Sequence, residues 1–244
     1  MKLRELYLTF DVEPFWTNIP IIFGRDAWDS QLDDSAKWTV DFIDYCNKNN
    51  LPATFFIVGE WARRNSDIVK LIGDNKNFQI GSHSHWHEDL ALKNDDEFIE
   101  DVRLSKNVIE DLISRNICRF RAPSFSLRPD QVSLLANIGF EIDSSITTAK
   151  RLYGSQNSPV QFPDNMHQIP FEGKNIFGVE FTVLGGGYLR LLPTPVLKAC
   201  SKLHLGNMIY LHPHDLPDRI DSYEPFTWKQ NLAKTIRFGN MFDK

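Results

Sequence analysis

The segment Ile80-Gly81-Ser82-His83-Ser84-His85-Trp86-His87 places three of the chain's seven histidines within five residues. A short apolar run leads into it, which predicts a buried strand ending at the histidines. A neutral imidazole nitrogen is the commonest protein ligand for a transition metal, and an imidazole is costly to bury without a partner. We therefore interpret His83 and His87 as ligands of one metal ion. If the segment stays extended, His85 shares their face; a solvated loop with no role is the other alternative.

Strand and helix patterns alternate on both sides of this segment. Strands are predicted at 6–12, 53–58, 78–81, 118–122, 140–143 and 208–211. Between them, helical spacing of apolar residues predicts helices that begin near 33 and that span 59–72, 95–114 and 129–138. This order predicts a parallel sheet with helices outside it. With no linker or repeat in the chain, we predict one domain over residues 1–244.

Polar side chains cluster at the carboxyl ends of the predicted strands. They are Asp11, His83, Arg121, Asp143 and His212. In a barrel these ends meet at one mouth, whereas an open sheet brings only a few together near its switch point. The sequence therefore favours an α/β fold of the distorted (β/α) barrel type.

Composition limits the function classes. Hydrophobic residues make up 42% and charged residues 24%, and the net charge is −5 without a long basic run. That balance argues against a nucleic-acid binder, and no apolar stretch is long enough to predict a transmembrane segment. An odd number of widely spaced cysteines, three in all, and no recognisable secretory signal favour the cytoplasm.

Two acidic residues and one basic residue are candidates for the chemistry. Asp11 and Glu13 are two apart on a strand and project from one face, so one can bind metal while the other takes a proton. A buried Arg121 needs a carboxylate, and Asp11 is the candidate. Two acids facing water and a surface arginine are the alternatives.

The last strand leads into a second histidine-containing segment. His212 follows an apolar run, and a histidine held by an aspartate can protonate a leaving group, with His214 as a competing candidate. Asp143 alone would suit a helix cap. Earlier in the chain, Gly185-Gly186-Gly187 lacks the lysine of a phosphate loop; it permits close approach of a ligand or forms a mobile turn.

Taken in order, these segments resemble the polysaccharide deacetylase family, also called carbohydrate esterase family 4 or the NodB-homology domain. The resemblance covers about residues 6–215 and rests on Thr9-Phe10-Asp11, His83-Ser84-X-X-His87, Arg121-X-Pro123, Asp143-Ser144 and Leu211-His212. It implies a distorted barrel of seven parallel strands and a divalent metal, most often Zn2+, with Co2+, Mn2+ or Ni2+ as alternatives.

The resemblance also implies roles for individual residues. Asp11 is the expected general base, Arg121 orients it, His212 is the expected general acid and Asp143 tunes His212. His83 and His87 are the expected metal ligands. The family's usual metal-binding aspartate is replaced by Val12, which must face the other way, so Glu13 is the expected third ligand. Ser124 stands where an aromatic residue is usual, and its backbone N–H is a candidate oxyanion donor. Substrate contacts are expected from Ser124, Tyr188 and Leu211.

The expected function is therefore removal of an N-acetyl group from an amino sugar. Segments 185–193 and 210–213 resemble a subgroup that makes exported or surface polysaccharide. The expected partner is a carbohydrate with an N-acyl group, whether free, nucleotide-linked, lipid-linked or polymeric. A deformylase or other amide hydrolase, and a carbohydrate-binding protein without catalysis, are the alternatives. The sequence makes no prediction about oligomeric state.

Overall fold

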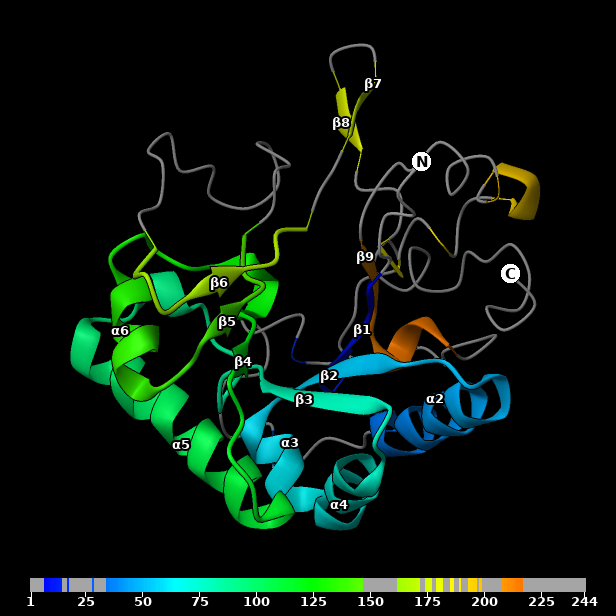
Figure 1. The fold of residues 1–244 in the computed structure, drawn as a ribbon, viewed down its shortest axis with the longest axis horizontal. Coiled ribbons are helices and arrows are strands. Elements are labelled where there is room, and N and C mark those ends of the chain that lie inside the picture. The colour runs from blue at the N-terminus through cyan, green and yellow to red at the C-terminus, as the bar shows by residue number, and fades with distance from the viewer. Residues whose placement is uncertain are drawn as a thin grey trace.

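The computed structural model describes residues 7–14, 17, 28, 34–146, 162–171, 174–176, 179–181, 185–186, 189, 193–196, 198 and 208–216. Its centre is a curled sheet of seven parallel strands in the order β6-β5-β4-β3-β2-β1-β9 (Figure 1). The strands are β1 (Tyr7–Val12), β2 (Ala53–Ile57), β3 (Phe78–Ser82), β4 (Arg119–Phe120), β5 (Ile142–Asp143), β6 (His167–Gln168) and β9 (Met208–Leu211). The predicted distorted barrel of seven parallel strands is confirmed.

Within the described part of the chain, five α-helices lie on the outer side of this sheet (Figure 1). They are α2 (Ser35–Asn49), α3 (Gly59–Arg64), α4 (Ser66–Asp74), α5 (Asp95–Ile113) and α6 (Gln131–Ile138). Helix α5 begins at a capping box, in which Asn94 and Glu97 each bond the other's backbone N–H. Among the described helices, none has the length and apolar character needed to span a bilayer.

The single helix predicted over 59–72 is wrong, because the chain forms α3 and α4 with a break between them. Asn65 has φ −123° and ψ 44°, outside the helical region. The Trp61 carbonyl accepts hydrogen bonds from both the Asn65 backbone N–H at 2.9 Å and the Asn65 side-chain amide at 3.0 Å, which caps the end of α3. A further pair, β7 (Lys174–Ile176) and β8 (Val179–Phe181), is antiparallel and stands apart from the main sheet (Figure 1).

The two faces of β1 separate the hydrophobic core from the polar interior. Phe10 and Val12 are fully buried in the core between sheet and helices, where the Phe10 ring stacks on Phe42 of α2 at 4.1 Å. Thr9 and Asp11 are also buried, but they point to the opposite face because side chains alternate along a strand. The concave face of the sheet therefore carries polar groups.

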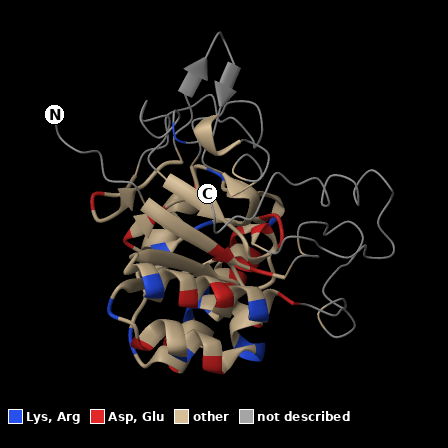
Figure 2. Ribbon diagram, turned by 90° about the vertical axis from the view of Figure 1, so that its right-hand side faces the viewer, with Lys and Arg blue, Asp and Glu red and all other residues tan. Residues whose placement is uncertain are grey.

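The carboxyl ends of the parallel strands place a row of side chains along one edge. The first residues after β1, β3, β4, β5 and β9 are Glu13, His83, Arg121, Ser144 and His212. On the outer helices, basic and acidic residues are interspersed (Figure 2). The carboxyl-terminal edge of the sheet, and not the outer surface of the helices, therefore brings the candidate site residues together.

Candidate active site

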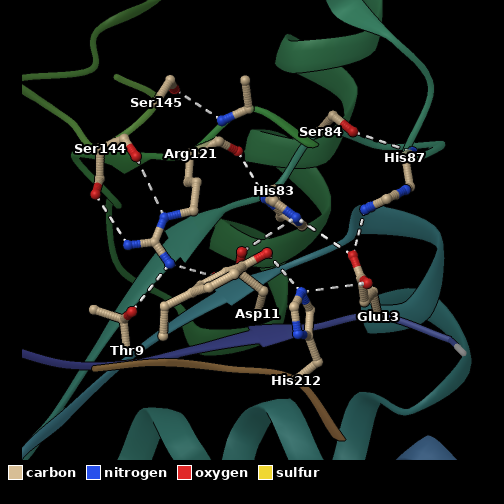
Figure 3. A network of polar contacts seen from close by, with 12 residues as sticks. Thr9, Asp11, Glu13, His83, Ser84, His87, Arg121, Ser144, Ser145 and His212 are labelled. Carbon is tan, nitrogen blue, oxygen red and sulfur yellow. Dashed lines mark hydrogen bonds and ion pairs between the residues drawn. The ribbon is translucent and has the colours of Figure 1, made fainter. Parts of the chain in front are cut away.

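Three buried donors converge at the strand ends. Glu13, His83 and His87 each offer a ligand atom, and these atoms lie within 4.8 Å of one another. His83 Nε2 is 3.5 Å from Glu13 Oε2, and His87 Nε2 contacts the same carboxylate oxygen (Figure 3). Two imidazoles and one carboxylate are a donor set typical of catalytic zinc and related divalent metals. The residues predicted as metal ligands are therefore brought together.

A sharp turn after β3 brings the two histidines to one side. Ser84 and His87 have φ of 62° and 59°, in the left-handed region. The Ser84 hydroxyl accepts a hydrogen bond from the His87 backbone N–H at 3.1 Å. The Ser84 carbonyl accepts one from Gly59, at the start of α3, at 2.9 Å. The turn is thus tied to the neighbouring strand–helix junction.

The turn directs His85 away from the other two histidines. Its Nε2 lies 3.9 Å from Glu60 of α3, and its backbone N–H donates to Asp101 of α5 at 2.6 Å. The extended alternative, in which His85 shares a face with His83 and His87, is therefore wrong: positive φ at two positions breaks the period of two.

Protonation of this donor set suits a cation. The Arg121 carbonyl can only accept, so the His83 Nδ1 at 2.8 Å must carry the proton, and a neutral ring then presents a bare Nε2. Burial alone raises the pKa of Glu13, but the neighbouring imidazoles of His87 and His83 hold that pKa well below its usual value. Glu13 is therefore a carboxylate, and the residues present fit a divalent metal ion.

Asp11 lies beside the donor set. One of its carboxylate oxygens is hydrogen-bonded to Arg121, and the other is directed toward His83. Its Oδ1 accepts a hydrogen bond from Arg121 Nη1 at 2.6 Å. Its Oδ2 is buried, makes no hydrogen bond among the described residues and lies 3.5 Å from His83 Nε2 (Figure 3). An ionised carboxylate oriented in this way can accept a proton from a water molecule next to the histidines.

Arg121 is held on every side. Its side chain is fully buried, and the guanidinium carbon lies 4.1 Å from the Phe56 ring centroid. Its nitrogens donate to Thr9 Oγ1 at 3.0 Å, Ser144 Oγ at 3.0 Å and Met208 Sδ at 2.8 Å, besides Asp11. Because a guanidinium is planar and permanently charged, this arrangement fixes Asp11 in one orientation. The predicted pairing of Arg121 with Asp11 is confirmed.

The expected role of Asp143 is corrected. Its Oδ1 accepts hydrogen bonds from the Ser145 backbone at 3.1 Å and from the Ser145 hydroxyl at 2.5 Å. Ser145 in turn accepts from the Ala122 N–H. Burial raises the pKa of Asp143 to about 6, although hydrogen bonds from Ser145 and the charge of Arg121 oppose this. Asp143 therefore supports the turn beside Arg121, and a different aspartate contacts His212.

That aspartate is Asp215. The segment after β9 forms a 3-10 turn, η4 (Pro213–Asp215), which brings Asp215 back to the residue that starts it. Its Oδ2 accepts from the His212 backbone N–H at 2.9 Å and from His212 Nδ1 at 3.0 Å. His212 Nε2 lies 3.9 Å from Glu13 Oε1 on the other side (Figure 3). His212 is thus oriented toward the metal-ligand group.

The surroundings of His212 favour its charged form. Burial alone lowers the pKa of His212, but the hydrogen bond and charge of Asp215, with the charges of Glu13 and Asp11, raise that pKa to about 9. Tyr210 OH is 2.6 Å from His212 Nε2, and burial raises the pKa of Tyr210 well above its usual value, so it stays a phenol. His212 is therefore poised to donate a proton from Nε2.

The competing histidine has a different position. The ring of His214 stacks on that of His212, with centroids 4.7 Å apart and planes 17° apart. It is His212 that contacts Glu13, which supports His212 as the acid. The sequence prediction did not assign a role to Asp215. A local signal for it exists, because an aspartate three residues after His212, with a proline directly after the histidine, is typical of a capped turn.

The predicted substrate contacts have different outcomes. Leu211 is corrected: it pairs with Phe10 across β1 and β9, so its side chain lies on the core face, 5% exposed. Ser124 is exposed, with φ 52°, in the middle of η3 (Pro123–Phe125), and its role stays a prediction. Tyr188 lies outside the described residues.

Comparisons with known proteins identify related sequences and structures. Residues 2–142 match the family model "Polysaccharide deacetylase", and residues 144–244 match "Domain of unknown function (DUF3473)". The peptidoglycan-N-acetylglucosamine deacetylase of Bacillus cereus is 32% identical over 101 residues, which are 41% of this chain. The chain spans only 34% of the length of that relative.

Solved structures share the fold. BA3943 of Bacillus anthracis, described as a carbohydrate esterase family 4 pseudoenzyme, is 19% identical, with a TM-score of 0.54 over 87% of this chain and 56% of that one. A family 4 carbohydrate esterase from Streptomyces lividans, solved with acetate, is 14% identical, with a TM-score of 0.53 over 95% of this chain and 84% of that one. The first family match covers more than half of the 244 residues and contains Asp11, Glu13, His83, His87 and Arg121. The chain belongs to the polysaccharide deacetylase family.

Proposed function

We propose that this protein is a divalent-metal hydrolase that removes an N-acetyl group from an amino sugar in a glycan, glycolipid or sugar precursor. The observation that carries the proposal is the convergence of three kinds of group at one edge of the sheet. These are a carboxylate fixed by a buried arginine, a three-donor metal site and a histidine held by an aspartate. Metal-assisted hydrolysis of an amide uses all three: a base for the water, a Lewis acid for the carbonyl and an acid for the leaving amine.

Glu13, His83 and His87 are the residues that hold the metal in this proposal. A bound divalent cation supplies Lewis acidity, which polarises a carbonyl and lowers the pKa of water from 15.7 to about 7 in favourable cases. The hydrogen bond from His83 Nδ1 to the Arg121 carbonyl orients the His83 ring and links the metal site to the base.

Asp11 is the general base. Arg121 holds Oδ1, so Oδ2 faces the histidines and takes the proton of the attacking water. The water oxygen bonds to the acetamido carbon, and negative charge develops on the former carbonyl oxygen. The backbone N–H of Ser124 is our candidate donor to that oxygen.

His212 is the general acid. Its Nε2 proton passes to the sugar nitrogen as the bond between carbon and nitrogen breaks, which yields acetate and a free amine. Asp215 keeps the ring charged and aligned before the transfer. Because an amine anion is a very poor leaving group, this proton transfer is required for turnover.

The setting of the reaction is also a proposal. The resemblance of the carboxyl-terminal segments to the subgroup noted above suggests a role in making surface polysaccharide. The free thiols of Cys46 and Cys118 agree with a reducing, cytoplasmic compartment.

A screen for acetate release tests the function directly. Purified protein is assayed for bound metal, stripped with a chelator, reloaded with Zn2+, Co2+, Mn2+ or Ni2+, and incubated with N-acetylated monosaccharides, sugar nucleotides, glycolipids and peptidoglycan. Acetate release that disappears on chelation and returns on reloading is expected. Release of formate in place of acetate would favour the deformylase alternative, as measured by product mass.

A carbohydrate-binding protein without catalysis is a second candidate because the similar structure of BA3943 is described as a pseudoenzyme. Metal binding without turnover on any of these substrates would support it. Full activity in the chelated protein would refute the metal-dependent mechanism.

A further inference from the structure

Gly185 and Gly186 lie against the part of the site that contains His212 and Asp215. Gly185 forms a parallel bridge with Tyr210 of β9, and Gly186 is buried. A Cβ atom built at Gly186 would lie 1.9 Å from Asp215 Oδ2 and 2.4 Å from Asp215 Cγ. Both distances are far shorter than the non-bonded contacts that a Cβ atom makes in proteins. The close approach that this motif permits is therefore to the chain's own carboxylate.

Asp215 has little freedom to yield. The same Oδ2 atom accepts both hydrogen bonds from His212, to the backbone N–H at 2.9 Å and to Nδ1 at 3.0 Å. The side chain is 4% exposed. A carboxylate pushed away from residue 186 must lengthen or break its bonds to His212. The absence of a side chain at residue 186 thus bears directly on the orientation of the histidine.

We propose that Gly186 is a positioning residue for the general acid: only glycine leaves room for the Asp215 carboxylate that aligns His212. The proposal rests on the function proposed above. It also gives the segment 144–244 a role in the reaction, because Gly186, His212 and Asp215 all lie within it, whereas the base and the metal donors lie within 2–142.

The first test compares two leaving groups in the Gly186→Ala variant. We expect turnover of the N-acetyl sugar to fall roughly 100-fold, within the range that a positioned acid contributes. Hydrolysis of 4-nitrophenyl acetate should stay within about twofold of wild type, because a nitrophenolate departs without a proton. A general loss of structure would reduce both rates together.

A double-mutant cycle tests whether the effect passes through Asp215. Alanine at position 215 lacks all three carboxyl atoms that a Cβ at 186 would meet, so Gly186→Ala should have little effect in an Asp215→Ala background. We expect the roughly 100-fold effect to shrink to about twofold there, which is a strong coupling between the sites. An equal effect of Gly186→Ala in both backgrounds would overturn the proposal.

A spectroscopic signature gives a readout that does not depend on turnover. The Nδ1 proton of His212, hydrogen-bonded to Asp215, should give a downfield proton resonance in wild type that is lost or shifted upfield in Gly186→Ala. Persistence of this resonance in a fully active variant would contradict the proposal.

Gly73→Ala is the matched control. A Cβ there would lie 2.9 Å from Ile113 Cγ2, so it crowds the packing of α4 on α5 instead of the site. We expect it to lower stability while leaving the ratio of amide to ester turnover unchanged. If wild type itself releases no acetate from any substrate, the proposed function fails, whereas the resonance still tests the Gly186 contact.

Discussion

Replacement of Asp215 by asparagine should move the alkaline limb of the pH–rate profile. The pKa of His212 is raised to about 9 from the 6.5 of an ordinary histidine, and the hydrogen bond that His212 donates to Asp215 is the first of the effects that raise it. A cation between Glu13 and the histidines offsets the charges of Glu13 and Asp11, so Asp215 becomes the main support of the charged ring. Asparagine keeps the shape of the side chain and removes its charge.

The magnitude follows from the fraction of protonated acid. At about pH 8, a group with a pKa of about 9 is about 90% protonated and one with a pKa of 6.5 is about 3% protonated, a ratio of roughly 30. The sign is fixed: the acid works while it carries its proton, so activity is present below the pKa and is lost as pH rises through it. Asp215→Asn should therefore lose activity at lower pH than wild type, by up to roughly 30-fold at about pH 8.

The assay is kcat/KM for acetate release measured from about pH 6 to about pH 10 in wild type and variant. Asp143→Asn is the control, because Asp143 bonds Ser145 and should leave the alkaline limb where it is. An unmoved limb in Asp215→Asn together with a shifted limb in Asp143→Asn would refute the reasoning and restore Asp143 as the partner of His212.

Three further predictions follow from the same geometry. His83→Ala should lose bound metal and activity, whereas His85→Ala should keep its metal because that ring faces Glu60; metal analysis after dialysis distinguishes them. Asp11→Asn should retain metal and lose turnover, and an active variant with full metal content would remove the base assignment. Arg121→Met should lower the free energy of unfolding in urea by about 3–5 kcal/mol, because it leaves a buried carboxylate without its partner. The exposed pair of Lys37 with Asp41 is the comparison, since Lys37→Gln should cost less than about 1 kcal/mol.

The parts of the fold that depend on local periodicity were predictable. The alternation of strand and helix patterns correctly indicated a parallel sheet, and polar residues at strand ends correctly indicated a common site. The period of two in β1 placed Glu13 on the face of Asp11 and Val12 on the other, as the structure has them. The alternation of side chains is a property of a single strand, so it can be predicted from the sequence of that strand without knowing which strands it pairs with.

Some failures of prediction also have local causes. The break at Asn65 escaped notice because one polar residue hardly disturbs a helical pattern of apolar residues. The direction of His85 depends on positive φ at Ser84 and His87, which serines and histidines adopt only rarely.

What the sequence by itself determined is which side chains face the interior of the sheet and which strand end each one occupies. Only the tertiary structure decided which of them meet. Asp143 is the last residue of β5 and Asp215 lies in the turn after β9, and that turn places Asp215 in contact with His212. Gly186 packs against that aspartate, although the two residues are 29 positions apart in the sequence. Such pairings depend on the register of β9 against β1 and on the close approach of distant backbones, and neither leaves a periodic trace in the sequence.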